Sequence, residues 1–327
     1  MISNLVDLKD IFFSLASKNK TIAIVTHQNP DGDGLPASFA LKKILAQRRI
    51  YSKVILEEEP PEIYDFLDVK KNCEVLSESM EFELIILVDC HEKKRVGKNS
   101  ILIEKANGII AIDHHPAGEV IPCSNTFIDT KIVSAGAIIY RLFAEEIEYF
   151  PKDVKNYLGK AFYTTILNDT DNFMNANVDK LTFEICAELM ETGITPGNIT
   201  EKFLLNKSAS EMKFIGEVLS TIELHYNGKV MFLNSTLKML QDNNLSSEAT
   251  TKLTRWVKGT KGVKVFVYFR EIGDNKYRLS LRSNFINVNA IAVKFDGGGH
   301  TKASGCEMNG DFAAVKEIIL KEIGVQL

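Results

Sequence analysis

The first half of the chain alternates short apolar runs with longer amphipathic segments. Four runs rich in isoleucine and valine are almost continuously hydrophobic, which is typical of strands buried on both faces of a sheet. They span residues 21–27, 52–57, 84–89 and 109–115. Helical patterns lie between or after them, at residues 33–49, 134–147, 153–168 and 179–191. Strands that alternate with helices in this way predict an α/β domain built on a parallel sheet.

The last third of the chain has a different pattern. A Thr-Gly-Ile-Thr-Pro-Gly-Asn stretch at residues 192–198 interrupts the helical periodicity, and a long helical segment at 199–224 follows it. Strands are then predicted at 229–234, 262–270 and 276–282, and helices at 247–258, 287–294 and 311–323. The 327 residues exceed what one hydrophobic core usually organises. We therefore predict two domains, 1–195 and 196–327, of which the second is a linker helix with a smaller α+β domain.

Composition narrows the class of protein. The chain is 45% hydrophobic and 25% charged, which are ordinary globular values, and its formal net charge is −4. Proteins that grip long nucleic acids by their phosphates are usually basic, so a nucleic-acid partner should be short. Five scattered cysteines without a Cys-x-x-Cys pair favour neither a disulfide framework nor a thiolate zinc site.

The sequence offers no signal for a membrane. The first ten residues lack a basic head followed by an apolar stretch, and no apolar run approaches the ~20 residues that a membrane span needs. We expect a cytoplasmic protein.

Acidic and histidine side chains gather where the predicted elements end. In an open parallel sheet, active sites lie beyond the carboxyl ends of the strands. A lone aspartate after a strand is more often a helix cap or turn residue than a ligand, but several at one edge favour a functional site. The candidates are His27, Asp31, Asp33, Asp89, Asp113, His114, His115 and Asp169.

The types of these side chains indicate a metal site. Carboxylates and imidazoles without thiolates suit Mn²⁺, Mg²⁺ or Zn²⁺. Gly32 lets the backbone turn between Asp31 and Asp33. The candidates outnumber the protein ligands of one ion, so we predict two divalent metal ions, which together clamp phosphate oxygens and lower the pKa of an attacking water.

Five motifs then carry a resemblance. They are His27-x-x-Pro30-Asp31-Gly32-Asp33, Val88-Asp89, Asp113-His114-His115, Asp169-Thr170, and Gly297-Gly298-Gly299-His300 followed by Ala303-Ser304-Gly305. In this order and over nearly the whole length, the chain resembles the DHH phosphoesterase superfamily, and within it the RecJ-related nano-RNase/pAp-phosphatase group. Inorganic pyrophosphatases of the superfamily share the first four motifs but lack the glycine loop.

The resemblance implies a role for each matching residue of the first domain. His27 and Asp31 would hold one metal ion, and Asp33, His114 and Asp169 the other, with Asp89 bridging both; the expected ion is Mn²⁺. Asp113 would orient a ligand histidine. His115 would face the substrate phosphate and help to protonate the leaving oxygen. The family has no ligand at the position of His91, which we interpret as a histidine at the surface or behind the ligands.

The second domain would hold the substrate in a cleft between the domains. Glycines let backbone amides approach an anion closely, and a planar guanidinium suits phosphate or a base. The predicted substrate-binding residues are Arg282, Gly297, Gly298, Gly299 and His300. Three residues depart from the family pattern. Pro36, followed by alanine, stands where the family commonly has Gly-Ser. Asp171 replaces the glycine of the Asp-Thr-Gly motif, and Asp296 replaces the first glycine of a loop that commonly has four.

The resemblance implies hydrolysis of short oligoribonucleotides to monophosphates, of 3′-phosphoadenosine 5′-phosphate to AMP, or of both. The expected partners are short RNA or small phosphorylated nucleotides, with no membrane; a homodimer stays open. One alternative is a cyclic- or linear-dinucleotide phosphodiesterase. An alternative of another class is a catalytically silent, metal-stabilised nucleotide-binding protein.

Overall fold

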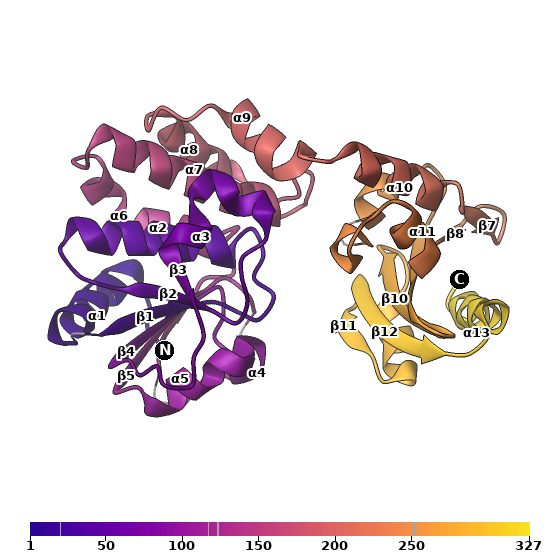
Figure 1. Ribbon diagram of the computed structural model, residues 1–327, viewed down its shortest axis with the longest axis horizontal. Helices are drawn as coiled ribbons and strands as arrows, with labels where there is room; N and C mark the ends of the chain where they lie inside the picture. Colours follow the sequence, from indigo (N-terminus) through magenta and orange to yellow (C-terminus); the bar gives the residue numbers. More distant parts are fainter. Residues whose placement is uncertain (20, 117, 123, 251–252) are drawn as a thin grey trace. The chain divides into compact units, whose positions relative to one another are not determined.

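The chain folds into two compact units, Met1–Asn206 and Lys207–Leu327 (Figure 1). The computed structural model describes residues 1–327 except 20, 117, 123 and 251–252. Among the described residues, none of the helices combines the length and apolar character needed to cross a bilayer.

The first unit is built on a parallel sheet of six strands in the order β3-β2-β1-β4-β5-β6. Their bounds are Ile22–Val25 (β1), Lys53–Leu56 (β2), Cys73–Val75 (β3), Leu84–Val88 (β4), Gly108–Asp113 (β5) and Asn125–Ile128 (β6). The four predicted strands correspond to β1, β2, β4 and β5, so the predicted α/β fold class is confirmed. The two edge strands, β3 and β6, were not predicted, because each is short and carries polar residues.

Helices cover both faces of this sheet. The longer ones are α1 (Leu5–Lys18), α2 (Gly34–Gln47), α6 (Ala135–Ile147), α7 (Lys152–Asp169) and α8 (Lys180–Met190). The shorter ones are η1 (Glu62–Leu67), α3 (Val69–Asn72), α4 (Lys93–Val96), η2 (Gly97–Asn99), α5 (Ser100–Lys105), α9 (Pro196–Thr200) and η3 (Glu201–Leu205). Helices α1, α2, α6 and α7 pack on one face, and α4 and α5 on the other.

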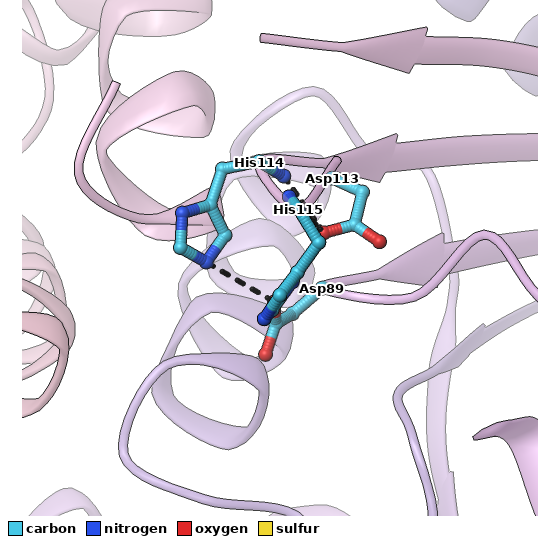
Figure 2. A group of neighbouring side chains, drawn as sticks. All are labelled: Asp89, Asp113, His114 and His115. Carbon is cyan, nitrogen blue, oxygen red and sulfur yellow. Dashed lines mark hydrogen bonds and ion pairs between the residues drawn. The ribbon is translucent and has the colours of Figure 1, made fainter. Parts of the chain in front are cut away.

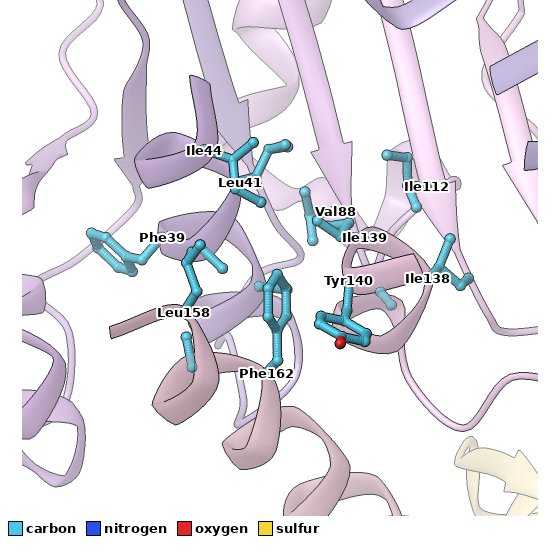
Figure 3. Packing of buried hydrophobic residues seen from close by; sticks show 14 of the residues in the cluster. Phe39, Leu41, Ile44, Val88, Ile112, Ile138, Ile139, Tyr140, Leu158 and Phe162 are labelled. Atoms are coloured by element: carbon cyan, nitrogen blue, oxygen red, sulfur yellow. The ribbon is translucent and has the colours of Figure 1, made fainter. Parts of the chain in front are cut away.

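The central strands are buried because their side chains alternate between two cores. Ile86 and Val88 of β4 pack with residues of α2, α6 and α7, whereas Ile85 and Leu87 belong to the cluster on the opposite face. Figure 3 shows the first of these clusters around Val88. Both faces are therefore apolar, which explains the nearly continuous hydrophobic runs in the sequence. Packing on both faces fixes the carboxyl ends of the strands, and this positions the side chains that follow them.

The second unit contains a mixed sheet in the order β11-β12-β10-β9-β8-β7, in which only β8 and β9 pair in parallel among the described strands. The strands are Glu223–His225 (β7), Val230–Ser235 (β8), Val265–Gly273 (β9), Lys276–Ser283 (β10), Gly298–His300 (β11) and Ala303–Asn309 (β12). The helices are Ala209–Leu219 (α10), Leu237–Asp242 (α11), Ser247–Thr250 (η4), Leu253–Val257 (η5), Val288–Ala292 (α12), Val293–Phe295 (η6) and Phe312–Gly324 (α13). This confirms the predicted smaller α+β part.

Two predicted helices are wrong. The helix expected at 199–224 is interrupted between η3 and α10, where Ser208 forms a capping box with Glu211 and starts a new helix. The helix expected at 247–258 is replaced in its described parts by η4 and η5, and residues 251–252 lie outside the described residues. In the first stretch the apolar spacing suited one continuous helix, but the capping box at Ser208 interrupts it.

The local backbone accommodates each of the three residues that depart from the family pattern. Asp171 and Asp296 both adopt left-handed backbone conformations, with φ of 49° and 55°. Glycine adopts this conformation without strain, and aspartate is one of the few other residues that tolerate it. Pro36 lies in the first turn of α2, where a missing backbone N–H costs no helical hydrogen bond.

Candidate metal centre

The structure brings the eight predicted residues of the first unit together beyond the carboxyl ends of the parallel strands. His27 follows β1, Asp89 follows β4, and Asp113 ends β5. Three overlapping groups have ligand atoms that lie within 4.8 Å of one another. They are His27, Asp31 and Asp89; Asp33, His114 and Asp169; and Asp89, Asp113, His114 and His115.

Asp89 lies between the two groups predicted to hold separate ions. Its Oδ2 is 3.4 Å from Nε2 of His27, and its Oδ1 is 3.6 Å from Nε2 of His114. The residue has a left-handed φ of 59°, an uncommon conformation at the end of a buried strand. Each carboxylate oxygen thus faces a different group, which is the arrangement that a bridging ligand requires.

In the first group, backbone contacts orient the side chains. Nδ1 of His27 donates to the carbonyl oxygen of Gln28 at 2.8 Å, so Nε2 is the nitrogen available to a metal. Nε2 lies 3.7 Å from Oδ1 of Asp31. The Asp31 carboxylate accepts hydrogen bonds from the amide of Asp33 at 2.9 Å and from the side chain of Asn168 at 3.1 Å.

The second group is buried more deeply. Nε2 of His114 lies 3.2 Å from Oδ2 of Asp169 and 3.7 Å from Oδ2 of Asp33. Asp33 precedes α2 but does not cap it with its side chain. Its carboxylate instead accepts the amides of Ala135 (2.6 Å) and Gly136 (2.9 Å), at the start of α6. Asp33 therefore does not cap its own helix, but its carboxylate caps α6 and lies at the positive end of that helix dipole.

Gly32 allows the loop between Asp31 and Asp33 to fit. A Cβ atom at this position would collide with the ring of Phe203 and the side chain of Asn168. Because glycine has no Cβ, the loop that carries Asp31 and Asp33 can pack directly against Phe203 and Asn168.

Within the described part of the chain, four buried polar atoms of the cluster have no hydrogen-bond partner. They are Nε2 of His27, Oδ1 of Asp89, Nε2 of His114 and Oδ2 of Asp169. Buried polar atoms are normally paired, since an unpaired one costs free energy. All four belong to the predicted ligand groups, and all are atoms that bind divalent cations. The donor set therefore fits metal ions, and the cluster is a centre able to bind metal.

The pKa shifts reflect an excess of carboxylates. Burial and the charges of Asp169 and Asp89 raise the pKa of Asp33 well above its usual value. Burial and the charges of Asp31 and Asp89 raise the pKa of Asp169 to about 8. These carboxyl groups cannot all ionise together without a nearby cation. Burial also lowers the pKa of His114 and favours its neutral form, the form that binds metals.

Asp113 orients His115 (Figure 2). Its Oδ1 accepts the Nδ1–H of His115 at 2.9 Å and the backbone amides of His114 and His115 at 2.7 and 3.0 Å. The hydrogen bond to Asp113 and the nearby charge of Asp89 raise the pKa of His115 to about 10 despite its burial. The hydrogen bond from Nδ1 to Asp113 leaves Nε2 as the ring nitrogen available to a substrate. Asp113 contacts His114 only through its backbone, so the imidazole that it orients is not that of the predicted metal ligand.

His91 is part of the same network, and its interpretation as a surface histidine is wrong. It is only 1% exposed, and its Nδ1 lies 2.5 Å from Oδ2 of Asp113. The amide of Gly118 donates to Nε2 of His91 at 3.1 Å, so the proton is on Nδ1, which donates to Asp113. The alternative of a histidine behind the ligands is the one that the geometry fits. The sequence did offer one indication of this role, because His91 lies two residues after Asp89 at the end of a buried strand.

In the second unit, Arg282 and part of the glycine loop line a cavity of about 580 Å³. Gly297 and Gly298 line it, whereas Gly299 and His300 are not among its lining residues. A Cβ atom on Gly298 would meet nothing, so packing does not require glycine there. Gly299 has a φ of 139°, and a Cβ atom there would clash with the carbonyl oxygen of Ala303. The local backbone therefore requires glycine at this position.

Two family models match the chain, one in each unit. Residues 21–167 match the DHH family, N-terminal domain, and residues 213–324 match the DHHA1 domain. The chain belongs to the DHH family, with a DHH N-terminal domain followed by a DHHA1 domain.

Relatives extend the likeness over nearly the whole chain. A Mycoplasma pneumoniae protein named bifunctional oligoribonuclease and PAP phosphatase NrnA is 24% identical, over 93% of this chain and 93% of its own. A protein of the same name from Bacillus subtilis is 26% identical, over 88% of this chain and 89% of its own. The crystal structure of an exopolyphosphatase-related protein from Bacteroides fragilis shares the fold, with a TM-score of 0.87, 23% identity, and coverage of 96% and 94%.

Metal binding should release protons. At pH 7 the metal-free chain holds a proton on Asp169, with a pKa of about 8, and on His27, where Asp31 and Asp89 outweigh burial and raise the pKa to about 10. Both protons must leave before these atoms bind a cation. The metal-free form binds more protons, so Mn²⁺ affinity should increase as pH rises from about 6 to 8. Calorimetric titration in two buffers with different ionisation heats measures the release, and Asp169→Asn should release fewer protons. Binding without any proton release would contradict these pKa shifts.

Proposed function

We propose that this chain is a two-metal phosphoesterase that hydrolyses short oligoribonucleotides to monophosphates and removes phosphate from 3′-phosphoadenosine 5′-phosphate. The observation that carries the proposal is the position of Asp89, whose two oxygens face two different groups of metal-binding atoms. The names of the Mycoplasma pneumoniae and Bacillus subtilis relatives support the same pair of substrates.

The chain's own residues define the two ion positions. His27, Asp31 and Asp89 would hold one divalent ion, and Asp89, Asp33, His114 and Asp169 the other. The oxygen and imidazole donors suit Mn²⁺, the ion that we propose. A pair of such ions supplies Lewis acidity to a phosphate and makes water a better nucleophile.

His115 is the proposed proton donor to the leaving oxygen. Its side chain is 37% exposed, so a substrate can reach the ring, and Nδ1 is engaged by Asp113. Because Nδ1 is engaged by Asp113, the other ring nitrogen, Nε2, is the atom proposed to deliver the proton. Asp113 is a positioning residue: it is fully buried, and its two oxygens are occupied by His115, His91 and backbone amides.

The second unit is proposed to hold the nucleotide. Arg282 lines the cavity beside Gly297 and Gly298, and among the described residues its guanidinium donates only to the carbonyl oxygens of Leu281 (2.9 Å) and Ser304 (3.4 Å). It can therefore accept a phosphate without breaking an ion pair. Gly299 and His300 complete the proposed set, because they belong to the same loop. The net charge of −4 favours short substrates over long RNA. A homodimer, a cytoplasmic location and an active site between the domains stay predictions.

The proposal is tested by hydrolysis with Mn²⁺ of 3′-phosphoadenosine 5′-phosphate, of RNA two to five residues long, and of a twenty-residue RNA. We expect the two short substrates to be hydrolysed much faster than the long one. Asp89→Asn should lower the rate at least a hundredfold, because several kcal/mol of transition-state stabilisation depends on the ions. Asp10→Asn, which changes an exposed acid on α1, is the matched control and should be as active as the parent.

Two results would reject the proposal. One is full activity in excess chelator, which would exclude the metals. The other is a metal-loaded chain that binds nucleotides without hydrolysing them, which would instead support the catalytically silent binding protein. Preferential cleavage of a cyclic or linear dinucleotide second messenger would favour the other alternative.

His91 should affect turnover through Asp113. His91→Ala removes a buried partner of the carboxylate, and we expect kcat to fall about tenfold or more with little change in KM, because the substrate does not touch His91. His91→Asn can place an amide N–H near the position of Nδ1 and should restore most of kcat. Steady-state kinetics on variants with matched melting temperatures provide the measurement. An unchanged kcat in His91→Ala would show that backbone amides alone hold Asp113.

A further inference from the structure

The last turn of α7 places a side-chain amide between the two groups of metal-binding atoms. Asn168 directly precedes Asp169, and its Nδ2 lies 2.9 Å from Oδ1 of Asp169 and 3.1 Å from Oδ2 of Asp31. Asp31 belongs to the group with His27, whereas Asp169 belongs to the group with His114. One amide nitrogen therefore contacts a carboxylate of each group.

The chemistry of the two neighbours fixes the orientation of this amide. Both are carboxylate oxygens, which accept hydrogen bonds, so the nitrogen rather than the oxygen of the Asn168 side chain faces them. The NH2 group has two hydrogens, one for each carboxylate. The amide is neutral, so it holds two acidic groups close together without adding a positive charge that would repel a metal ion.

The same two hydrogen bonds determine which carboxylate oxygens are left for the ions. Asn168 occupies Oδ1 of Asp169, and the other oxygen, Oδ2, lies 3.2 Å from Nε2 of His114. It occupies Oδ2 of Asp31, and the other oxygen, Oδ1, lies 3.7 Å from Nε2 of His27. In each carboxylate the amide thus holds one oxygen and leaves the other beside the imidazole of its own group.

The helix that carries Asn168 is firmly packed. Phe162 and Ile166 of α7 belong to the core of the first unit, and the hydroxyl of Thr170 donates to the carbonyl oxygen of Ile166 at 2.6 Å. The side chain of Asn168 also packs on Gly32, where an added Cβ atom would lie only 2.8 Å from its Cβ. Because the amide is fixed from both sides, it can impose an orientation on the carboxylates.

We propose that Asn168 is a positioning residue shared by both ion sites, which holds the carboxylates of Asp31 and Asp169 in the orientations that two neighbouring ions need. The inference rests on the two-ion centre of the proposed function. His27 and His114 each belong to one site, whereas Asn168 supports a ligand of both. Loss of its amide should therefore weaken both ions, by roughly ten- to a hundredfold each, the usual cost of removing a group that orients a metal ligand.

Binding of Mn²⁺ to the metal-free, full-length chain tests this role without a substrate. Asn168→Leu keeps about the same side-chain size beside Gly32 and removes both donors. Calorimetric titration should give two ions per parent chain, and the variant should bind each of them roughly ten- to a hundredfold more weakly. Electron paramagnetic resonance at two equivalents of Mn²⁺ should show a spin-coupled pair in the parent and mainly uncoupled Mn²⁺ in the variant.

Asn177→Ala is the matched control. The side-chain amide of Asn177 donates to the backbone carbonyl oxygen of Asp169 at 3.2 Å, so it supports the same residue without contacting a carboxylate. The control should keep both parental Mn²⁺ affinities and the spin-coupled spectrum. Asn168→Ala replaces the leucine variant if that variant is unfolded.

The possible results separate the positioning role from the proposed function. An Asn168 variant that keeps both parental affinities, or loses only one of them, would overturn the shared role. An equal loss in Asn177→Ala would also overturn it, because general support of the end of α7 would then explain the effect. A parent that binds fewer than two Mn²⁺ ions would refute the two-metal function and the shared role with it. A parent that binds two ions but hydrolyses nothing would refute the function and leave the positioning role standing.

Discussion

The charge of the carboxylates around Asp89 is the constraint on which the first unit depends. Asp31, Asp33, Asp89 and Asp169 converge on the imidazoles of His27 and His114, and several of their polar atoms are buried without partners. Burial and mutual repulsion raise the pKa of Asp33 and Asp169, which means that the free chain compensates with protons. Divalent ions would replace those protons and relieve the repulsion. Buried carboxylates that repel one another lower the stability of the folded chain, so a structural role alone does not explain the cluster.

The surrounding fold holds this unfavourable arrangement in place. Strands β4 and β5 are buried between two apolar layers, and they deliver Asp89 and Asp113 to the same edge. Asp33 is fixed by the first amides of α6, which are more than a hundred residues away in sequence. Asp113 is held by backbone amides on one side and by His91 on the other. A rigid support of this kind keeps ligands oriented when the ions are absent.

Much of this could be predicted from the sequence, because buried parallel strands have a strong hydrophobic signal and their carboxyl ends share one edge. That reasoning places His27, Asp89 and His114 together without knowledge of any contact. It could not reveal that Asp33 is bound by α6 or that His91 supports Asp113, since these contacts join distant segments. The break before α10 was missed because a Ser208–Glu211 capping box overrides apolar spacing.

A crystal structure of the Mn²⁺-loaded chain, with anomalous scattering measured at the manganese edge, tests the central claim most directly. Two anomalous peaks about 3.5–4 Å apart are expected. One should be ligated by His27 and Asp31 and the other by Asp33, His114 and Asp169, with one oxygen of Asp89 on each. A single peak, or two peaks of which Asp89 touches only one, would contradict it.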